Sequence, residues 1–288
     1  MFNRADILTR YPWLTRRERR MIIGNDLDAL LSAQFLQHTL GWSIAGFYNY
    51  STLYHDPAID PRECVWVDLD IYDRACASIG HHILQPSPAD RIPGHRSSVN
   101  PNLLRAVDQT DFAHKYPLGT IHLLLWLADS TWINAQRYRS NVREWLTRWI
   151  TVPELLDTFD QTDTPDFEAE MQAQVLARLA IAELAPGNVQ NVSNHLGLGG
   201  YQCAWDKPED LLKVHRVTNL IERAFGWRAP QFPREFKSIE GVRRSAKLPD
   251  LVKKYGSFDK FLANEKVFSY VIPNKDRVNY TTGIVLSH

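Results

Sequence analysis

The stretch MIIGNDLDALLSA, at residues 21–33, constrains the fold more than any other part of this 288-residue chain. Its apolar run has the length of a strand, and apolar residues then recur at helical spacing as far as Gly41, which suits the end of a helix. Two further runs rich in β-branched and aromatic residues, at 42–50 and 63–71, have the character of strands. This alternation predicts βαβ units on a parallel sheet, and therefore an α/β fold. An apolar fraction of 44% is enough to give such a sheet a sizeable core.

Acidic side chains come where the predicted strands end. Asp26 and Asp28 follow the first strand, and Asp68 closes the third. Because ligands of open parallel sheets bind outside the carboxyl ends of the strands, we expect these carboxylates to lie at one edge. Carboxylates without cationic partners would repel one another there, and a divalent cation that prefers oxygen ligands, Mg²⁺ or Mn²⁺, would remove the repulsion. The histidines of SIGHHIL, at 78–84, and Asp129 after an apolar segment would complete the ligand set.

In this order, the segments resemble the motifs of the DHH phosphoesterases. This family includes the RecJ exonucleases, nano-RNA and cyclic-dinucleotide phosphodiesterases, and family II inorganic pyrophosphatases. NDLDALLSA is similar to the first motif, in which a strand is followed by Asp-x-Asp. CVWVDLD is similar to the second motif, GHH to the Asp-His-His of the third, and LADST to the fourth. The resemblance covers residues 20–130, which is under half of the chain.

The resemblance implies a centre of one or two Mn²⁺ or Mg²⁺ ions. The residues implied as ligands of the first ion are Asp28, Asp68, His81 and Asp129. A second ion would be held by Asp26 and Asp68, so that Asp68 bridges the two ions and is a catalytic residue. His82 would be the other catalytic residue, because it faces the substrate phosphate rather than a metal.

Two features depart from the family pattern. The additional ligand that relatives carry just ahead of the first motif would fall on Ile22 or Gly24, which leaves the second ion short of a protein ligand. The Asp of the Asp-His-His motif is replaced by Gly80, which removes a group that would orient the histidines.

Two domains are expected. Residues 1–185 would form a DHH-like metal-binding domain with a parallel sheet and helices on both faces, ending in a long connecting helix at about 164–184. Residues 186–288 would form a smaller, basic, substrate-binding α+β domain. The elements expected there are helices at about 207–225 and 248–264 and short strands near 267–272 and 283–286.

Positive charge is concentrated toward the C-terminus. Residues 207–288 carry 16 Lys and Arg against 9 Asp and Glu, whereas the first 206 residues carry 17 against 24. A phosphate-containing substrate would therefore be attracted to the C-terminal part of the chain. The side chains predicted to contact substrate phosphate are His82, His95, Arg96, Arg243 and Arg244.

These features predict a metal-dependent phosphoesterase that hydrolyses a phosphodiester in a nucleotide, a short oligonucleotide or a single-stranded nucleic acid. A catalytically degenerate protein that keeps the fold to bind a nucleotide or a partner is the alternative that the two departures suggest, and pyrophosphate hydrolysis would use the same chemistry. DLDALL also resembles the start of the haloacid dehalogenases, but Leu30 stands where that family needs Thr or Ser. Taken singly, each acid can instead be a helix cap or a surface charge, and the histidines can be core residues.

Cysteine spacing and the N-terminal sequence favour a reducing compartment. Cys64, Cys76 and Cys203 form no C-x-x-C pair, which argues against a disulfide scaffold or a thiolate zinc site. Neither a secretory leader nor a segment of transmembrane length is recognisable. A soluble, cytoplasmic protein without a membrane partner is therefore expected.

Overall fold

The computed structural model describes residues 3–87, 89–90, 92–116, 119–128 and 204–286. The predicted ligand Asp129, the predicted connecting helix at 164–184 and the predicted boundary near 185 lie outside the described residues.

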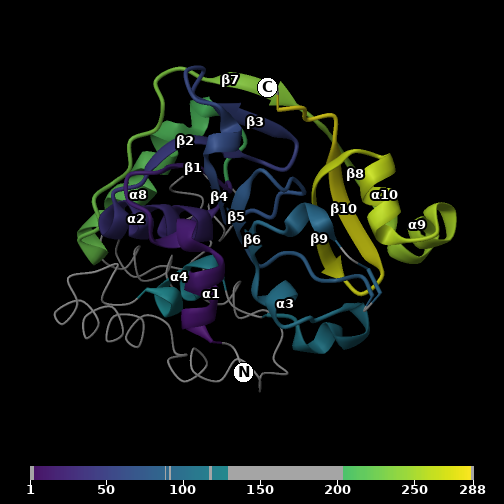
Figure 1. Cartoon of the computed structure of the whole chain (residues 1–288). Helices are drawn as coiled ribbons and strands as arrows, with labels where there is room; N and C mark the ends of the chain where they lie inside the picture. The colour runs from purple at the N-terminus through teal and green to yellow at the C-terminus, as the bar shows by residue number, and fades with distance from the viewer. Residues whose placement is uncertain (1–2, 88, 91, 117–118, 129–203, 287–288) are drawn as a thin grey trace, which may run out of the picture.

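A sheet of seven strands forms the centre of the larger unit (Figure 1). Its strands, in chain order, are β1 (Arg20–Ile23), β2 (Ser43–Tyr48), β3 (Thr52–His55), β4 (Val65–Val67), β5 (Ala77–Ile79), β6 (Ser98–Val99) and β7 (Lys237–Glu240). They lie side by side in the order β6-β5-β4-β1-β2-β3-β7. The pairs from β6 to β2 are parallel, whereas β3 and β7 add antiparallel strands at one edge. The predicted α/β fold with a largely parallel sheet is therefore confirmed.

The first strand and helix form where the sequence predicts them. Met21, Ile22 and Ile23 are fully buried in β1, and helix α2 (Leu27–Leu40) follows. The Asp26 side chain caps this helix by accepting a hydrogen bond from the backbone N–H of Ala29, at 3.0 Å. Gly41 ends the helix in the left-handed conformation, with φ of 71°, which glycine adopts without steric cost.

The main helices cover one face of the large sheet. Helices α1 (Arg4–Arg10), α2, α4 (Thr120–Leu127) and α8 (Leu211–Phe225) contribute to one apolar cluster with that face. The other face packs Tyr48 and Trp66 against Phe268 and the C-terminal segment rather than against a helix. Among the described residues, the prediction of helices on both faces is therefore wrong, because an antiparallel strand and the chain end occupy the second face.

A smaller antiparallel unit stands beside the large sheet (Figure 1). Its elements are β8 (Val242–Lys247), α9 (Leu248–Tyr255), α10 (Phe258–Asn264), β9 (Val267–Asn274) and β10 (Arg277–Thr282), with the strands in the order β8-β10-β9. The single helix predicted at 248–264 is divided at Gly256, whose φ is 84°. The prediction of a strand near 283–286 is wrong. Gly283, with φ of 85°, follows the end of β10, and the residues after it pack on the large sheet.

The chain from about 205 to 240 belongs to the larger unit. The Gln34 amide donates hydrogen bonds to the backbone oxygens of Thr218 and Trp227, at 3.0 and 3.1 Å, which attaches α8 to α2. Strand β7 pairs with β3, and β8 begins directly after Gly241. Within the described residues, the smaller unit is therefore 242–282. None of the described helices combines the length and apolar character that crossing a bilayer requires.

Candidate metal centre

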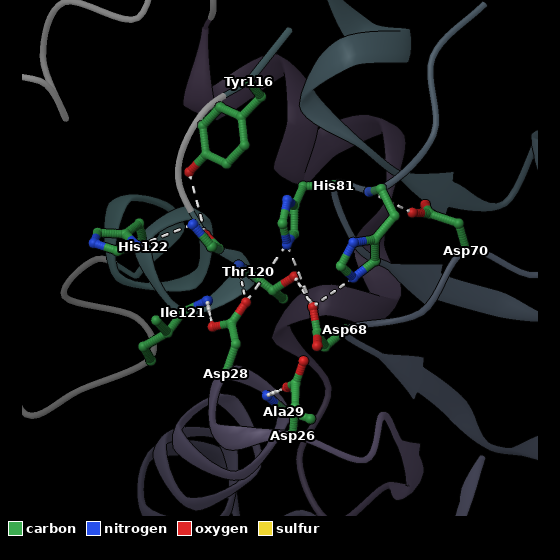
Figure 2. Close-up of polar contacts among 12 residues, drawn as sticks. Asp26, Asp28, Ala29, Asp68, Asp70, His81, Tyr116, Thr120, Ile121 and His122 are labelled. Atoms are coloured by element: carbon green, nitrogen blue, oxygen red, sulfur yellow. Dashed lines mark hydrogen bonds and ion pairs between the residues drawn. The ribbon is translucent and has the colours of Figure 1, made fainter. Parts of the chain in front are cut away.

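Three strand ends converge on one point of the large sheet. Strand β1 is followed in the sheet by β2 on one side and by β4 on the other, so the strand order reverses at β1. Such a reversal opens a crevice at the carboxyl ends of the strands, where α/β proteins bind ligands. Asp28 comes from the start of α2 after β1, Asp68 follows β4, and His81 follows β5 (Figure 2). His82 is the next residue in the chain.

Asp68, His81 and His82 each offer a ligand atom, and these atoms all lie within 4.8 Å of one another. The His82 Nε2 atom lies 3.2 Å from Asp68 Oδ1, and His81 Nε2 lies 3.6 Å from the same oxygen. His81 Nε2 is also 3.6 Å from Asp28 Oδ2. Asp28, Asp68 and His81 are buried, whereas His82 is partly exposed. The structure therefore brings four of the predicted site residues together.

The spacing of these atoms fits a shared divalent cation. With ligand bonds of about 2.1 Å, neighbouring ligand atoms of an octahedral ion lie about 3 Å apart and opposite ones about 4 Å apart. His81 Nε2 lies 3.6 Å from both Asp28 Oδ2 and Asp68 Oδ1, between these two values, so small side-chain movements would bring the three groups to one ion. Carboxylate oxygens and imidazole nitrogens are both common ligands of divalent metal ions.

Asp28 is held by the beginning of helix α4. Its Oδ2 accepts the backbone N–H of Thr120 at 2.6 Å, and its Oδ1 accepts that of Ile121 at 3.0 Å. These N–H groups have no partner within the helix, and the helix dipole favours a negative charge at this end. Gly119 allows the close approach, because a Cβ atom there would lie 2.7 Å from Asp28 Oδ2. Asp28 therefore binds α4, whereas Asp26 is the residue that caps α2.

Asp68 occupies a strained position. Its φ of 59° is in the left-handed region, which costs free energy for a residue with a side chain and occurs most often at functional sites. Its Oδ1 accepts a hydrogen bond from Thr120 Oγ1 at 2.7 Å. Thr120 is a site residue that the sequence did not reveal, because it comes to Asp68 only when α4 packs on α2.

Asp70 occupies the space beside the glycine of GHH. Its Oδ2 accepts the backbone N–H of His82, and its Oδ1 accepts the amide of Asn100, both at 3.0 Å. A Cβ on Gly80 would lie 2.7 Å from Asp70 Oδ2. Burial raises the pKa of Asp70 to about 6, although the Asn100 hydrogen bond and nearby His81 act against this. Asp70 thus supplies a carboxylate to the histidine turn where the sequence has only glycine.

The two positions ahead of the first motif offer no ligand. Ile22 is fully buried in the apolar cluster on the opposite face of the sheet. Gly24 lies beside the site, because a Cβ atom there would be 3.2 Å from Asp68 Oδ2, but glycine has no side chain that could be a ligand. Asp26 is not part of the group of three ligand residues found among the described residues.

The predicted phosphate contacts have different surroundings. His95 is 4% exposed, and its ring centroid lies 5.3 Å from those of both Tyr72 and Tyr270. Arg96 is exposed. The Arg243 guanidinium lies over the ring of Tyr50, and Arg244 lies 4.0 Å from Glu265.

Burial lowers the pKa of His95 to about 3. A hydrogen bond to the Ile71 backbone raises this pKa, but its effect is smaller than that of burial. A neutral, buried His95 offers no charge to a phosphate.

His95 is expected to make the folded protein sensitive to acid. Its folded pKa of about 3 is below the ordinary value of 6.5, so the unfolded chain binds a proton that the folded chain excludes. The free energy of unfolding should therefore fall as the pH drops below about 6.5, by up to about 1.4 kcal/mol per pH unit from this group. Urea unfolding between about pH 7 and pH 4.5 should show a shallower pH dependence for His95→Gln than for wild type. Parallel curves for the two proteins would contradict the assignment.

Comparisons with family models, curated proteins and solved structures each found no match.

Proposed function

We propose that this chain is a metal-dependent phosphoesterase that hydrolyses a phosphodiester in a nucleotide, a short oligonucleotide or a single-stranded nucleic acid. The observation that carries the proposal is the convergence of Asp68, His81 and His82 within 4.8 Å, at the point where the strand order reverses. The resemblance of the motif residues to the DHH phosphoesterases supports the same chemistry.

The residues of the cluster have different parts in this proposal. Asp68 and His81 would hold Mn²⁺ or Mg²⁺, with Asp28 beside them. The bound ion would polarise a phosphoryl oxygen and make a coordinated water more acidic. His82 is the most exposed member of the cluster, so its imidazole is the group that can reach a substrate phosphate. In its protonated form it would donate a charge-assisted hydrogen bond to a phosphoryl oxygen.

The beginning of helix α4 keeps the acidic groups in place. Thr120 donates to Asp68, and the first N–H groups of α4 bind Asp28, so both carboxylates are fixed before any ligand arrives. Fixed groups need little reorganisation when charge develops on a substrate, which lowers the free energy of the transition state.

A binding module without catalysis is the second candidate. Ile22 and Gly24 provide no ligand, so a second ion would have few protein contacts. Titration calorimetry with Mn²⁺ distinguishes the two. A degenerate site takes up at most one ion and shows no Mn²⁺-stimulated turnover.

The proposed activity is tested directly by hydrolysis assays. The substrates are bis-p-nitrophenyl phosphate, short single-stranded RNA and DNA, and pyrophosphate, each with Mn²⁺, with Mg²⁺ or with EDTA. We expect hydrolysis of the diesters that depends on the added metal. If pyrophosphate is the only substrate hydrolysed, the protein is a pyrophosphatase rather than a phosphodiesterase. If no substrate is hydrolysed, the proposal is contradicted.

A further inference from the structure

Tyr50 is held in an unusual backbone conformation beside the cluster. It lies in the turn between β2 and β3, with φ of 65°. The Asn49 side chain fixes this turn by accepting hydrogen bonds from the backbone N–H groups of Ser51 and Thr52, at 3.0 and 2.7 Å. Thr281 of β10 donates its hydroxyl hydrogen to the Tyr50 backbone oxygen. The backbone of this turn is therefore held by contacts from both units of the protein.

The ring of Tyr50 connects the cluster to an arginine of the smaller unit. Its centroid lies 6.3 Å from that of His82, with the two rings nearly perpendicular at 88°. The Arg243 guanidinium lies over the same ring, 5.8 Å from its centroid. The guanidinium is thus within about 12 Å of the His82 ring, a distance that a nucleotide can span.

Arg243 has the exposure that a ligand-binding arginine needs. It is exposed on β8, and no ion pair involving it is found in the described part of the chain. Its neighbour Arg244 is instead directed toward Glu265. A guanidinium without a carboxylate partner keeps its charge and its planar face for a ligand.

The Tyr50 hydroxyl belongs to the electrostatic surroundings of the cluster. Burial raises its pKa well above the ordinary value, and the charges of Asp68, Asp26 and Asp70 raise it further. The phenol therefore stays neutral, and the ring keeps the character of an aromatic surface rather than of an anion.

We propose that Tyr50 and Arg243 form a stacking site for the base of a nucleotide whose phosphate lies at the Asp68–His81–His82 cluster. This inference rests on the proposed function and adds the place where the base of the nucleotide substrate would bind. Every nucleobase has a π-face that can stack on an aromatic ring, and arginine planes stack on bases in the same way. The exposed Arg243 would move off the Tyr50 ring and cover the base.

Adenosine 5′-monophosphate and ribose 5-phosphate provide the test, because they share a phosphate and a ribose and differ in the base. Their affinities for the full chain are measured by titration calorimetry in a buffer containing MnCl2. Wild type should bind the nucleotide at least about tenfold more tightly than ribose 5-phosphate. Tyr50→Leu should bring the ratio of the two affinities close to one, whereas Tyr50→Phe keeps the ring and should keep the ratio.

Arginine variants provide the control for the surface charge. Arg243→Gln should reduce the ratio severalfold, whereas Arg277→Gln, at an exposed arginine of the same small sheet, should leave it unchanged. If Tyr50→Leu does not fold, the Arg243→Gln ratio decides alone. Equal binding of the two ligands by wild type, or no binding of either, would overturn the inference.

The inference and the proposed function can fail separately. If binding depends on the base and is lost in Arg243→Gln, but no diester is hydrolysed, the stacking site is supported and the proposed catalysis is contradicted. If diesters are hydrolysed in a metal-dependent way but the two ligands bind equally, the stacking site is contradicted and the proposed catalysis is supported.

Discussion

Replacing Asp68 with asparagine is expected to reduce Mn²⁺-stimulated diester hydrolysis by roughly 100-fold or more. Asn has nearly the same size as Asp and can still accept the hydrogen bond from Thr120, so the packing at the end of β4 should be preserved. What disappears is a negative charge that lies close to both histidines, whose Nε2 atoms are 3.6 Å (His81) and 3.2 Å (His82) from Asp68 Oδ1. Loss of a charged oxygen ligand weakens cation binding and removes charge from the site.

The matched control is Asp276→Asn. Asp276 is exposed in the turn between β9 and β10, in the smaller unit. This variant makes the same chemical change and should keep activity within about twofold of wild type, since surface substitutions of this kind have small effects. Equal activity of Asp68→Asn and Asp276→Asn, both folded by circular dichroism, would rule out a catalytic centre at Asp68.

Gly119→Ala is expected to lower the free energy of unfolding by about 2–4 kcal/mol. A Cβ at this position would lie 2.7 Å from Asp28 Oδ2 and 2.9 Å from both Cγ and Oδ1, closer than atoms can pack. Asp28 would have to move, which breaks its hydrogen bonds from Thr120 and Ile121 and leaves a buried carboxylate poorly paired. The same movement would take Asp28 away from His81.

Urea unfolding measures this effect, and Gly226→Ala is the control. Gly226 ends α8 with φ of 68°, and a Cβ there would meet nothing within 4 Å. Its substitution should cost only the penalty of a left-handed alanine, about 1–2 kcal/mol. A Gly119→Ala variant no less stable than Gly226→Ala, with full activity, would show that the contact between Asp28 and α4 is not required.

Local sequence signals predicted the part of the fold from β1 to Gly41. A buried apolar run and the glycine at the helix end act over a few residues, so the sequence displays them directly. Which of the two acids caps the helix was not predicted: it is Asp26, whereas Asp28 binds α4. The acids at the strand ends were also visible, because parallel strands present their carboxyl ends on one edge.

Contacts between distant segments were not predictable in the same way. Thr120 and Asp70 join the site through packing of α4 and through the space left by Gly80, and neither is marked by a local pattern. The sequence pattern predicts helices on both faces of the sheet, because nothing in it shows that Phe268 and the segment after Gly283 cover the second face. Tyr50 was missed for the same reason, since its importance depends on His82 and Arg243.

The most direct test of a cation centre is anomalous scattering from a crystal of the protein soaked in MnCl2. The proposal predicts a manganese peak at the carboxyl ends of β4 and β5, with Asp68 oxygen and His81 Nε2 about 2.0–2.3 Å away. A crystal in which manganese binds only elsewhere, or not at all, while Asp68 and His81 keep their present positions would contradict it.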